Sequence, residues 1–138
     1  FNVYGPRQNP SSPYSGVISI FADRFKKSNP QIKVFGNGEQ TRDFIYVKDL
    51  VSIVINSLKS ENTIGKIYNV CTGVETSLND VIRVFEDITN KDALIVYEKE
   101  RAGDIRRSVG DNFLIKHDGL IDKYISLDEG LNLLYESI

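Results

Sequence analysis

The sequence predicts an α/β fold. Apolar residues recur at helical spacing in several segments, and short runs with the alternation or β-branching typical of strands lie between those segments. Such alternation of strand and helix patterns favours helices packed against sheets. The chain has 138 residues and is 41% hydrophobic, which is enough to bury a core, and no linker rich in Pro, Gly and Ser divides it. We therefore expect one domain over 1–138.

In the first part of the chain we expect a strand over 1–4, an irregular loop over 7–14 and a helix over 17–28. The loop contains two prolines with two serines between them, a composition typical of turns. Large apolar side chains recur at every fourth position of the helix, at 17, 21 and 25. An Asn-Pro pair follows, which is a helix stop signal.

Two strands are expected next, over 31–35 and 43–47, with a glycine-rich turn between them that begins at Gly36. A helix over 48–59 follows them. Its apolar residues form a broad face rather than a narrow stripe, which predicts that this helix is deeply packed.

The next expected elements are a strand over 67–71, bounded by glycines, and a helix over 77–88. Ser77 followed three residues later by Asp80 resembles a capping box, and apolar residues keep to one face of the helix for three turns. Another strand is expected over 93–97.

The C-terminal part is expected to contain a short helix that begins near Asp111 and a last helix that begins at Ser126. Glu129, three residues after Ser126, completes a second capping box. The apolar residues of the last helix are expected to face the core; they are Leu127, Leu131, Leu134 and Ile138.

Charge and composition exclude several classes of function. Seventeen basic and nineteen acidic residues give a formal net charge of −2, without the basic patch of a nucleic-acid-binding protein. No apolar stretch reaches the roughly 20 residues that span a bilayer. A single cysteine, Cys71, excludes an internal disulfide and fits a cytoplasmic location; we expect a buried structural thiol. The single histidine, His117, is expected to be solvated, and no zinc site is expected.

The first candidate for chemistry is Arg42, which follows the glycine-rich turn. A glycine turn lets backbone amides approach a ligand, and the strand behind it would fix the arginine at the exit of the turn. A guanidinium placed there could bind a phosphate or a carboxylate in bidentate fashion. The alternative is a hairpin turn with a surface ion pair between Arg42 and Asp43.

The second candidate is the charged segment 101–107, in which Arg101 and Asp104 flank Gly103. Two arginines from separate loops could hold a diphosphate between them, and a carboxylate could accept hydrogen bonds from a ribose diol. The alternative is a solvated loop that neutralises its own charges.

Four motifs in order resemble the C-terminal part of the NAD-dependent epimerase/dehydratase family, the extended short-chain dehydrogenases. They are FNVYGPRQ at 1–8, YSGVI at 14–18, the glycine turn with RDF at 42–44, and RAGD at 101–104. The closest likeness within the family is to UDP-sugar 4-epimerases. The resemblance implies an extended Rossmann fold of which this chain is the substrate-binding C-terminal portion.

The resemblance also implies roles for individual residues. By its motifs, Arg42 and Arg101 would bind the diphosphate and Asp104 the ribose. Asn2 would bind the diphosphate as well, and Phe1 would lie at the sugar pocket. The base pocket would be formed by Gly16, Val17, Lys33 and Phe35.

Ser108 matches a family position whose bulk limits the space around the second carbon of the sugar. Because serine is small, we expect that the parent enzyme accepts UDP-N-acetylglucosamine as well as, or instead of, UDP-glucose. The alternative is an ordinary serine at the end of a strand.

The chain lacks the catalytic half of the family site. None of its seven tyrosines is followed four residues later by lysine, so the Tyr-x-x-x-Lys pair of the family is absent, and Thr41 stands where a dinucleotide fingerprint would have its third glycine. The resemblance therefore implies that a missing N-terminal portion binds NAD, that this chain is inactive alone, and that the parent enzyme is a homodimer. The alternatives are a UDP- or dTDP-sugar dehydratase or decarboxylase of the same family, or a non-catalytic nucleotide-sugar-binding module.

Overall fold

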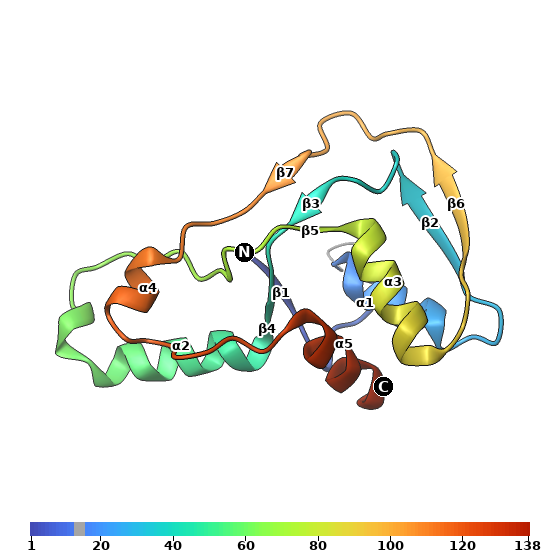
Figure 1. Ribbon diagram of the computed structural model, residues 1–138. Coiled ribbons are helices and arrows are strands. Elements are labelled where there is room, and N and C mark those ends of the chain that lie inside the picture. The colour runs from blue at the N-terminus through green and yellow to red at the C-terminus, as the bar shows by residue number, and fades with distance from the viewer. Residues whose placement is uncertain (13–15) are drawn as a thin grey trace.

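The computed structural model describes residues 1–12 and 16–138 and has the expected mixture of strands and helices (Figure 1). In chain order the elements are β1 (Asn2–Tyr4), α1 (Val17–Phe25), β2 (Gln31–Phe35), β3 (Thr41–Arg42), β4 (Phe44–Tyr46), α2 (Val47–Lys59), the 3-10 turn η1 (Glu61–Thr63), β5 (Thr76–Ser77), α3 (Leu78–Thr89), β6 (Leu94–Glu98), β7 (Arg107–Ser108), α4 (Phe113–His117) and α5 (Leu127–Glu136).

The strands of the described residues form three small sheets. β1 pairs in parallel with β4, and β2 pairs in parallel with β6 along its whole length. In the third sheet the central strand β3 pairs antiparallel with β5 and parallel with β7. Parallel pairs joined through helices confirm the α/β prediction.

The larger hydrophobic core lies where α1, α3 and α5 pack together beside the strands β2 and β4 (Figure 1). Phe25 of α1 and Phe85 of α3 are fully buried, and their rings stack with centroids 5.3 Å apart. Leu131 and Leu134 of α5 are buried in the same core, as predicted. Ile138, predicted to face the core, is 52% exposed because α5 ends at Glu136, before the chain reaches that position.

A smaller core holds α2 and α4 together at the other side of the molecule (Figure 1). Its buried residues are Ile45, Ile53, Ile115 and Leu120. The predicted helices at both places are confirmed, with α2 covering 47–59 and α4 beginning at Phe113. Deep packing of α2 is wrong for this chain, because only Asp49 and Ile53 of that helix are buried.

The N-terminus of α3 forms as its sequence predicts, whereas only one of the two bonds of the capping box predicted for α5 is present. The side chain of Ser77 accepts a hydrogen bond from the Asp80 amide, and the Asp80 side chain bonds back to Ser77, so the capping box is complete. Ser126 accepts a hydrogen bond from the Glu129 amide. Each bond satisfies an amide that has no partner inside the helix.

Two predicted boundaries near the start of the chain differ from the structure. α1 ends at Phe25 rather than at residue 28. The Lys27 amide donates to the Arg24 carbonyl, three residues back, instead of continuing the α-helical pattern. In addition, the residue before Pro30 is biased away from helical backbone angles. The loop predicted over 7–14 has no regular structure as far as Ser12, and its last two residues lie outside the described part.

Four of the five predicted strands form, and one does not. β1, β2 and β6 form within one residue of the expected bounds, and β4 is shortened because Val47 already begins α2. The strand predicted over 67–71 is wrong: none of the described strands pairs with this segment, and Ile67 is 91% exposed. A strand forms only where a neighbouring strand supplies the ladder of backbone hydrogen bonds. In this segment the Val70 carbonyl instead accepts a hydrogen bond from the Phe1 amino group.

Candidate functional site

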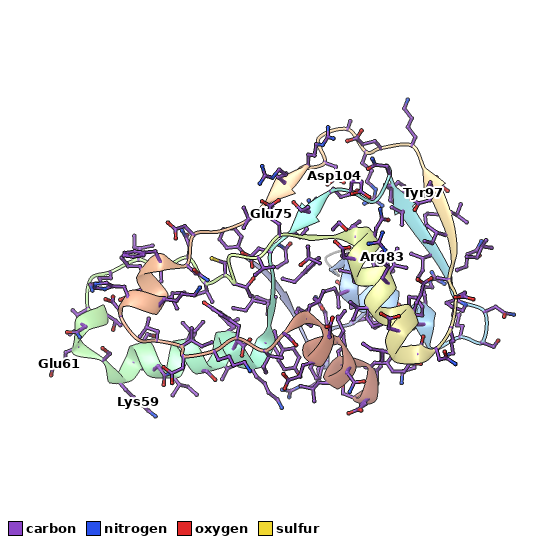
Figure 2. All side chains as sticks on the ribbon, in the orientation of Figure 1. Lys59, Glu61, Glu75, Arg83, Tyr97 and Asp104 are labelled. Atoms are coloured by element: carbon purple, nitrogen blue, oxygen red, sulfur yellow. The ribbon has the colours of Figure 1, made fainter. Side chains whose placement is uncertain are left out.

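A pocket of about 1010 Å³ lies between α1, the β2–β6 pair and the loop that joins β6 to β7. That loop arches away from the helices, with Asp104 on it (Figure 2). The ends of β1 and β3 complete the wall of the pocket. Strands and loops from opposite ends of the sequence therefore enclose one cavity large enough for a nucleotide-sized ligand.

Eight of the predicted site residues line this pocket. They are Asn2, Gly16, Val17, Lys33, Phe35, Arg42, Arg101 and Asp104. The remaining two lie beside it. The ring of Phe1 packs against Gly110, and Ser108 sits on β7 directly opposite Arg42.

Arg42 is held in place by three acceptors. Its Nη2 donates to Asp104 Oδ1 at 2.6 Å, and its Nη1 donates to the carbonyls of Thr41 and Ile105. Both members of the Arg42–Asp104 pair are mostly buried, with side chains 18% and 25% exposed. A surface ion pair between Arg42 and Asp43 is wrong, because Asp43 is fully buried and bonds elsewhere.

Arg101 reaches the pocket from the loop between β6 and β7. Its guanidinium lies over the Phe35 ring, 3.7 Å from the centroid, which is a cation–π contact. The loop does not neutralise its own charges, since Asp104 pairs with Arg42 of β3 instead. Two guanidinium groups and one carboxylate thus line the same pocket, although Arg42 lies about 60 positions before Arg101 and Asp104 in the sequence.

Glu75 fixes the sheet that carries Arg42 (Figure 2). Its carboxylate accepts hydrogen bonds from Thr41 Oγ1 at 2.9 Å and from the guanidinium of Arg107. These two donors hold the pKa of Glu75 below its usual value. The charge of Arg107 is therefore already balanced, and β3 is tied to β7 by side chains as well as by backbone.

The opposite wall of the pocket begins at the N-terminus of α1. Gly16 precedes the helix with extended backbone, and among the described residues no side chain caps it and no acid lies in its first turn. The first amides of the helix thus carry partial positive charge without a partner from the helix itself. Across from them, Lys33 pairs with Glu98 at 2.9 Å, an exposed contact of little energetic weight.

Sequence reasoning missed several residues that line the pocket. Among them are Gln8, Arg24, Gln31, Gln40, Val96 and Glu98. Periodicity could have found Gln31, because it shares a face of β2 with Lys33 and Phe35. Nothing in the local sequence indicates Gln40, whose side-chain Nε2 donates to the Phe35 carbonyl at 2.7 Å.

The residues outside the pocket conform to their predicted roles. Cys71 is fully buried, and burial raises the pKa of its thiol, so it is a structural residue. His117 is largely exposed beside Asp118. Within the described ranges, no cluster of His, Cys, Asp and Glu has the geometry of a metal site, and no helix is long and apolar enough to cross a membrane.

Comparison with known proteins identifies the family. The model of the NAD dependent epimerase/dehydratase family matches residues 1–71, half of the chain. The chain belongs to this family. Its relatives include a putative UDP-glucose 4-epimerase of Methanocaldococcus jannaschii, 40% identical over 106 residues, which are 77% of this chain and 33% of that protein.

Two solved structures of epimerases match nearly the whole chain. UDP-glucose 4-epimerase of Thermotoga maritima with UDP-glucose has a TM-score of 0.88 at 36% identity, over 99% of this chain and 43% of that one. UDP-N-acetylglucosamine 4-epimerase of Methanobrevibacter ruminantium M1, in complex with UDP-N-acetylmuramic acid, has a TM-score of 0.89 at 31% identity. The match covers 99% of this chain and 43% of that one.

The chain of this family member is short. It spans only 33% and 34% of the length of two curated epimerase relatives. Other relatives in the family carry out different reactions on nucleotide sugars, among them a UDP-N-acetyl-alpha-D-glucosaminuronate decarboxylase and an NDP-hexosamine 5,6-dehydratase.

Proposed function

We propose that residues 1–138 are the nucleotide-sugar-binding, C-terminal part of an NAD-dependent UDP-sugar 4-epimerase. The parent enzyme interconverts UDP-glucose and UDP-galactose, or their N-acetylated forms, by transient oxidation at the fourth carbon of the sugar. The observation that carries the proposal is that Arg42, Arg101 and Asp104 line the same pocket of about 1010 Å³. This part binds the UDP moiety and is inactive alone.

The chemistry of the pocket suits a nucleoside diphosphate. Guanidinium groups bind phosphate oxygens through charge-assisted, often bidentate hydrogen bonds, which is the role we assign to Arg42 and Arg101. Asp104 uses one carboxylate oxygen for Arg42, which leaves the other to accept from a ribose hydroxyl. The base would lie between the start of α1, at Gly16 and Val17, and the β2 residues Lys33 and Phe35. Asn2 adds a diphosphate donor, and Phe1 lies on the sugar side.

The residues of this chain do not fit NAD itself. The only closely spaced glycine pair in a turn, Gly36 and Gly38, has positive φ at both positions, but a side chain of the neighbouring α3 fills the approach. Asn79 Nδ2 donates to the Asn37 carbonyl at 3.1 Å, and the Asn79 amide donates to the Gly38 carbonyl. We propose that NAD, the family cofactor, is bound by the N-terminal part of the parent enzyme.

Calorimetric titration with UDP tests the proposed site. We expect Arg42→Ala and Arg101→Ala each to weaken UDP binding by at least about tenfold, because each removes a charge-assisted contact to phosphate. The matched control is Arg83→Ala, since Arg83 is an exposed arginine of α3 that does not line the pocket (Figure 2).

The titration is made on the 138-residue chain and on the full-length protein that contains it. Loss of affinity in the control equal to that in the two pocket variants would contradict the assignment of the arginines. Absence of UDP binding by the folded full-length protein would contradict the proposed function itself.

The small side chain of Ser108 extends the proposal to N-acetylated sugars. Ser108 is half-buried on β7, next to the strand of Arg42, and one similar structure is a UDP-N-acetylglucosamine 4-epimerase. We expect the full-length enzyme to turn over UDP-N-acetylglucosamine, and Ser108→Tyr to reduce kcat/KM for this sugar by more than tenfold relative to UDP-glucose. Equal losses for both sugars would contradict a role of Ser108 in selection.

A second candidate function is dehydration or decarboxylation of a UDP- or dTDP-sugar. The relatives that carry out these reactions favour it, because they share the same scaffold. Product analysis of the full-length enzyme by NMR separates the cases, since an epimerase conserves the mass of the sugar and the other two reactions release water or carbon dioxide. A non-catalytic nucleotide-sugar-binding module would bind UDP without forming any product.

The homodimeric state and the cytoplasmic location of the parent enzyme stay predictions. Sedimentation velocity of the full-length protein tests the first, and cell fractionation tests the second.

A further inference from the structure

Asp43 is a buried carboxylate between Arg42 and Phe44, which both line the pocket. It lies between β3 and β4, next to Arg42, and its residue is 0% exposed. Oδ1 accepts from the Thr72 amide at 2.8 Å and from Thr72 Oγ1 at 2.7 Å. Oδ2 accepts from the Gly73 amide at 2.9 Å and from the Gly110 amide at 3.2 Å.

The backbone carbonyl of Asp43 binds a third segment. It accepts from the Asn2 amide and from Asn2 Nδ2, both at 3.0 Å. Nδ2 carries two hydrogens, so one remains for a ligand while the other fixes the orientation of the side chain. The backbone of Asp43 thus orients Asn2 and holds its strand in register, and the carboxylate anchors that backbone to Thr72, Gly73 and Gly110.

The Gly110 contact extends this network to Ser108, two residues earlier. A side chain at Gly110 would overlap Cys71 and the Phe1 ring, so the Gly110 amide can lie against Asp43 only because that residue is glycine. The hydrogen bonds of Asp43 therefore connect three parts of the site. These are Phe1 and Asn2 at the start of the chain, Arg42 of β3, and the residues that follow Ser108.

We propose that Asp43 is a positioning residue of the nucleotide-sugar site, which sets Asn2, Arg42 and Ser108 in their mutual places without touching the ligand. The inference rests on the proposed function. Its physical basis is that all four donors to the carboxylate are uncharged N–H or O–H groups that converge on an acceptor-only side chain. An asparagine side chain at position 43 would direct its NH₂ group at one or more of these donors, which would leave those buried donors without an acceptor.

The test compares Asp43→Asn with the matched control Asp49→Asn in the full-length protein. Asp49 is also a buried carboxylate that accepts a backbone hydrogen bond, from Ile125 at 2.9 Å. Ile125 does not line the pocket, whereas Asn2, which donates to the Asp43 carbonyl, does. Thermal unfolding reports Tm, calorimetry reports Kd for UDP, and steady-state kinetics report KM and kcat for UDP-glucose.

We expect both variants to lower Tm, whereas only Asp43→Asn raises Kd and KM, by about tenfold, with a smaller change in kcat. Asp43→Asn protein that is folded and binds UDP as the control does would overturn the inference while leaving the proposed function intact. Wild-type protein that binds no UDP would overturn the proposed function and the inference with it.

A third variant decides the question if Asp43→Asn does not fold. Thr72→Val removes one hydroxyl donor and keeps the amide donor of the same residue. We expect it to raise Kd for UDP by a few-fold, in the same direction as the loss of the carboxylate. An unchanged Kd in folded Thr72→Val protein would overturn the inference.

Discussion

Asp118 joins two distant segments of the smaller core through three side chains. Its carboxylate accepts from Lys66 Nζ at 2.7 Å and from the Tyr68 hydroxyl at 2.6 Å, and it lies 3.0 Å from His117 Nδ1. The Asp118 side chain is 5% exposed, although its partners reach the surface. These contacts hold the C-terminal end of α4 against the segment that follows η1.

The ionisation of Asp118 is expected to make folding stability depend on pH. The hydrogen bonds from Lys66, Tyr68 and His117 hold the pKa of Asp118 well below its usual range. A depressed pKa in the folded state gives a stabilising contribution that is present above the unfolded pKa, about 4, and is lost as the pH falls toward the folded value. We expect Asp118→Asn to be less stable than wild type at pH 7, with a smaller difference at pH 3.

Urea unfolding at the two pH values measures this difference. The control is Asp122→Asn, because Asp122 is an exposed aspartate in the same part of the chain. A stability difference between wild type and Asp118→Asn that stays constant from pH 7 to pH 3 would contradict the role given to Asp118.

At the scale of the element, α2 has one face without a partner among the described residues. Ile53 is 2% exposed, whereas Val51, Val54, Ile55 and Leu58 are 44% to 83% exposed. The periodicity of the helix was sufficient to predict a broad apolar face, but not what covers it. We propose that the N-terminal part of the parent enzyme packs on this face.

The exposed face of α2 is expected to promote association of the isolated 138-residue chain. We expect Val54→Lys combined with Leu58→Lys to reduce self-association and leave Tm nearly unchanged, because both side chains already face solvent. Sedimentation velocity measures the association, and Ile64→Lys, a change at an 80% exposed residue outside the helix, is the control. Equal reduction by the control would show that this face is not the site of association.

At the scale of the whole molecule, the buried apolar residues that stabilise the fold form two cores of unequal size. The larger one contains the buried faces of α1, α3 and α5, and the smaller one has four buried residues from β4, α2, α4 and the segment after α4. Local opening is expected to be easiest where the fewest apolar contacts are lost. The pocket lies against the larger core, so its walls are on the more stable side.

Hydrogen exchange tests this division. We expect the amides of α4 and of the last turns of α2 to exchange faster than those of α1 and α3 by an order of magnitude or more, a ratio that mass spectrometry of peptic fragments resolves. Uniform protection across both regions would indicate a single cooperative unit and would contradict the prediction.

The sequence by itself determined the features that depend on neighbours along the chain. Helix α3 was predictable because Ser77 and Asp80 are three residues apart and the apolar positions repeat within each turn. The four motifs of the family were likewise readable from adjacent residues, and the resemblance that they carry named eight of the residues that line the pocket.

Only the tertiary structure decided which distant groups meet. Arg42 and Asp104 are 62 positions apart, and each had been assigned to a ligand before the structure paired them with each other. The strand predicted over 67–71 and the deep packing predicted for α2 were wrong, because among the described residues the segment has no sheet partner and the helix face has no cover. The physical reason is the separation along the sequence of the groups that interact. A helix cap or a periodic helix face depends on residues within one or two turns of each other. A strand ladder, an ion pair or the burial of a side chain depends on distant segments that the fold places beside it.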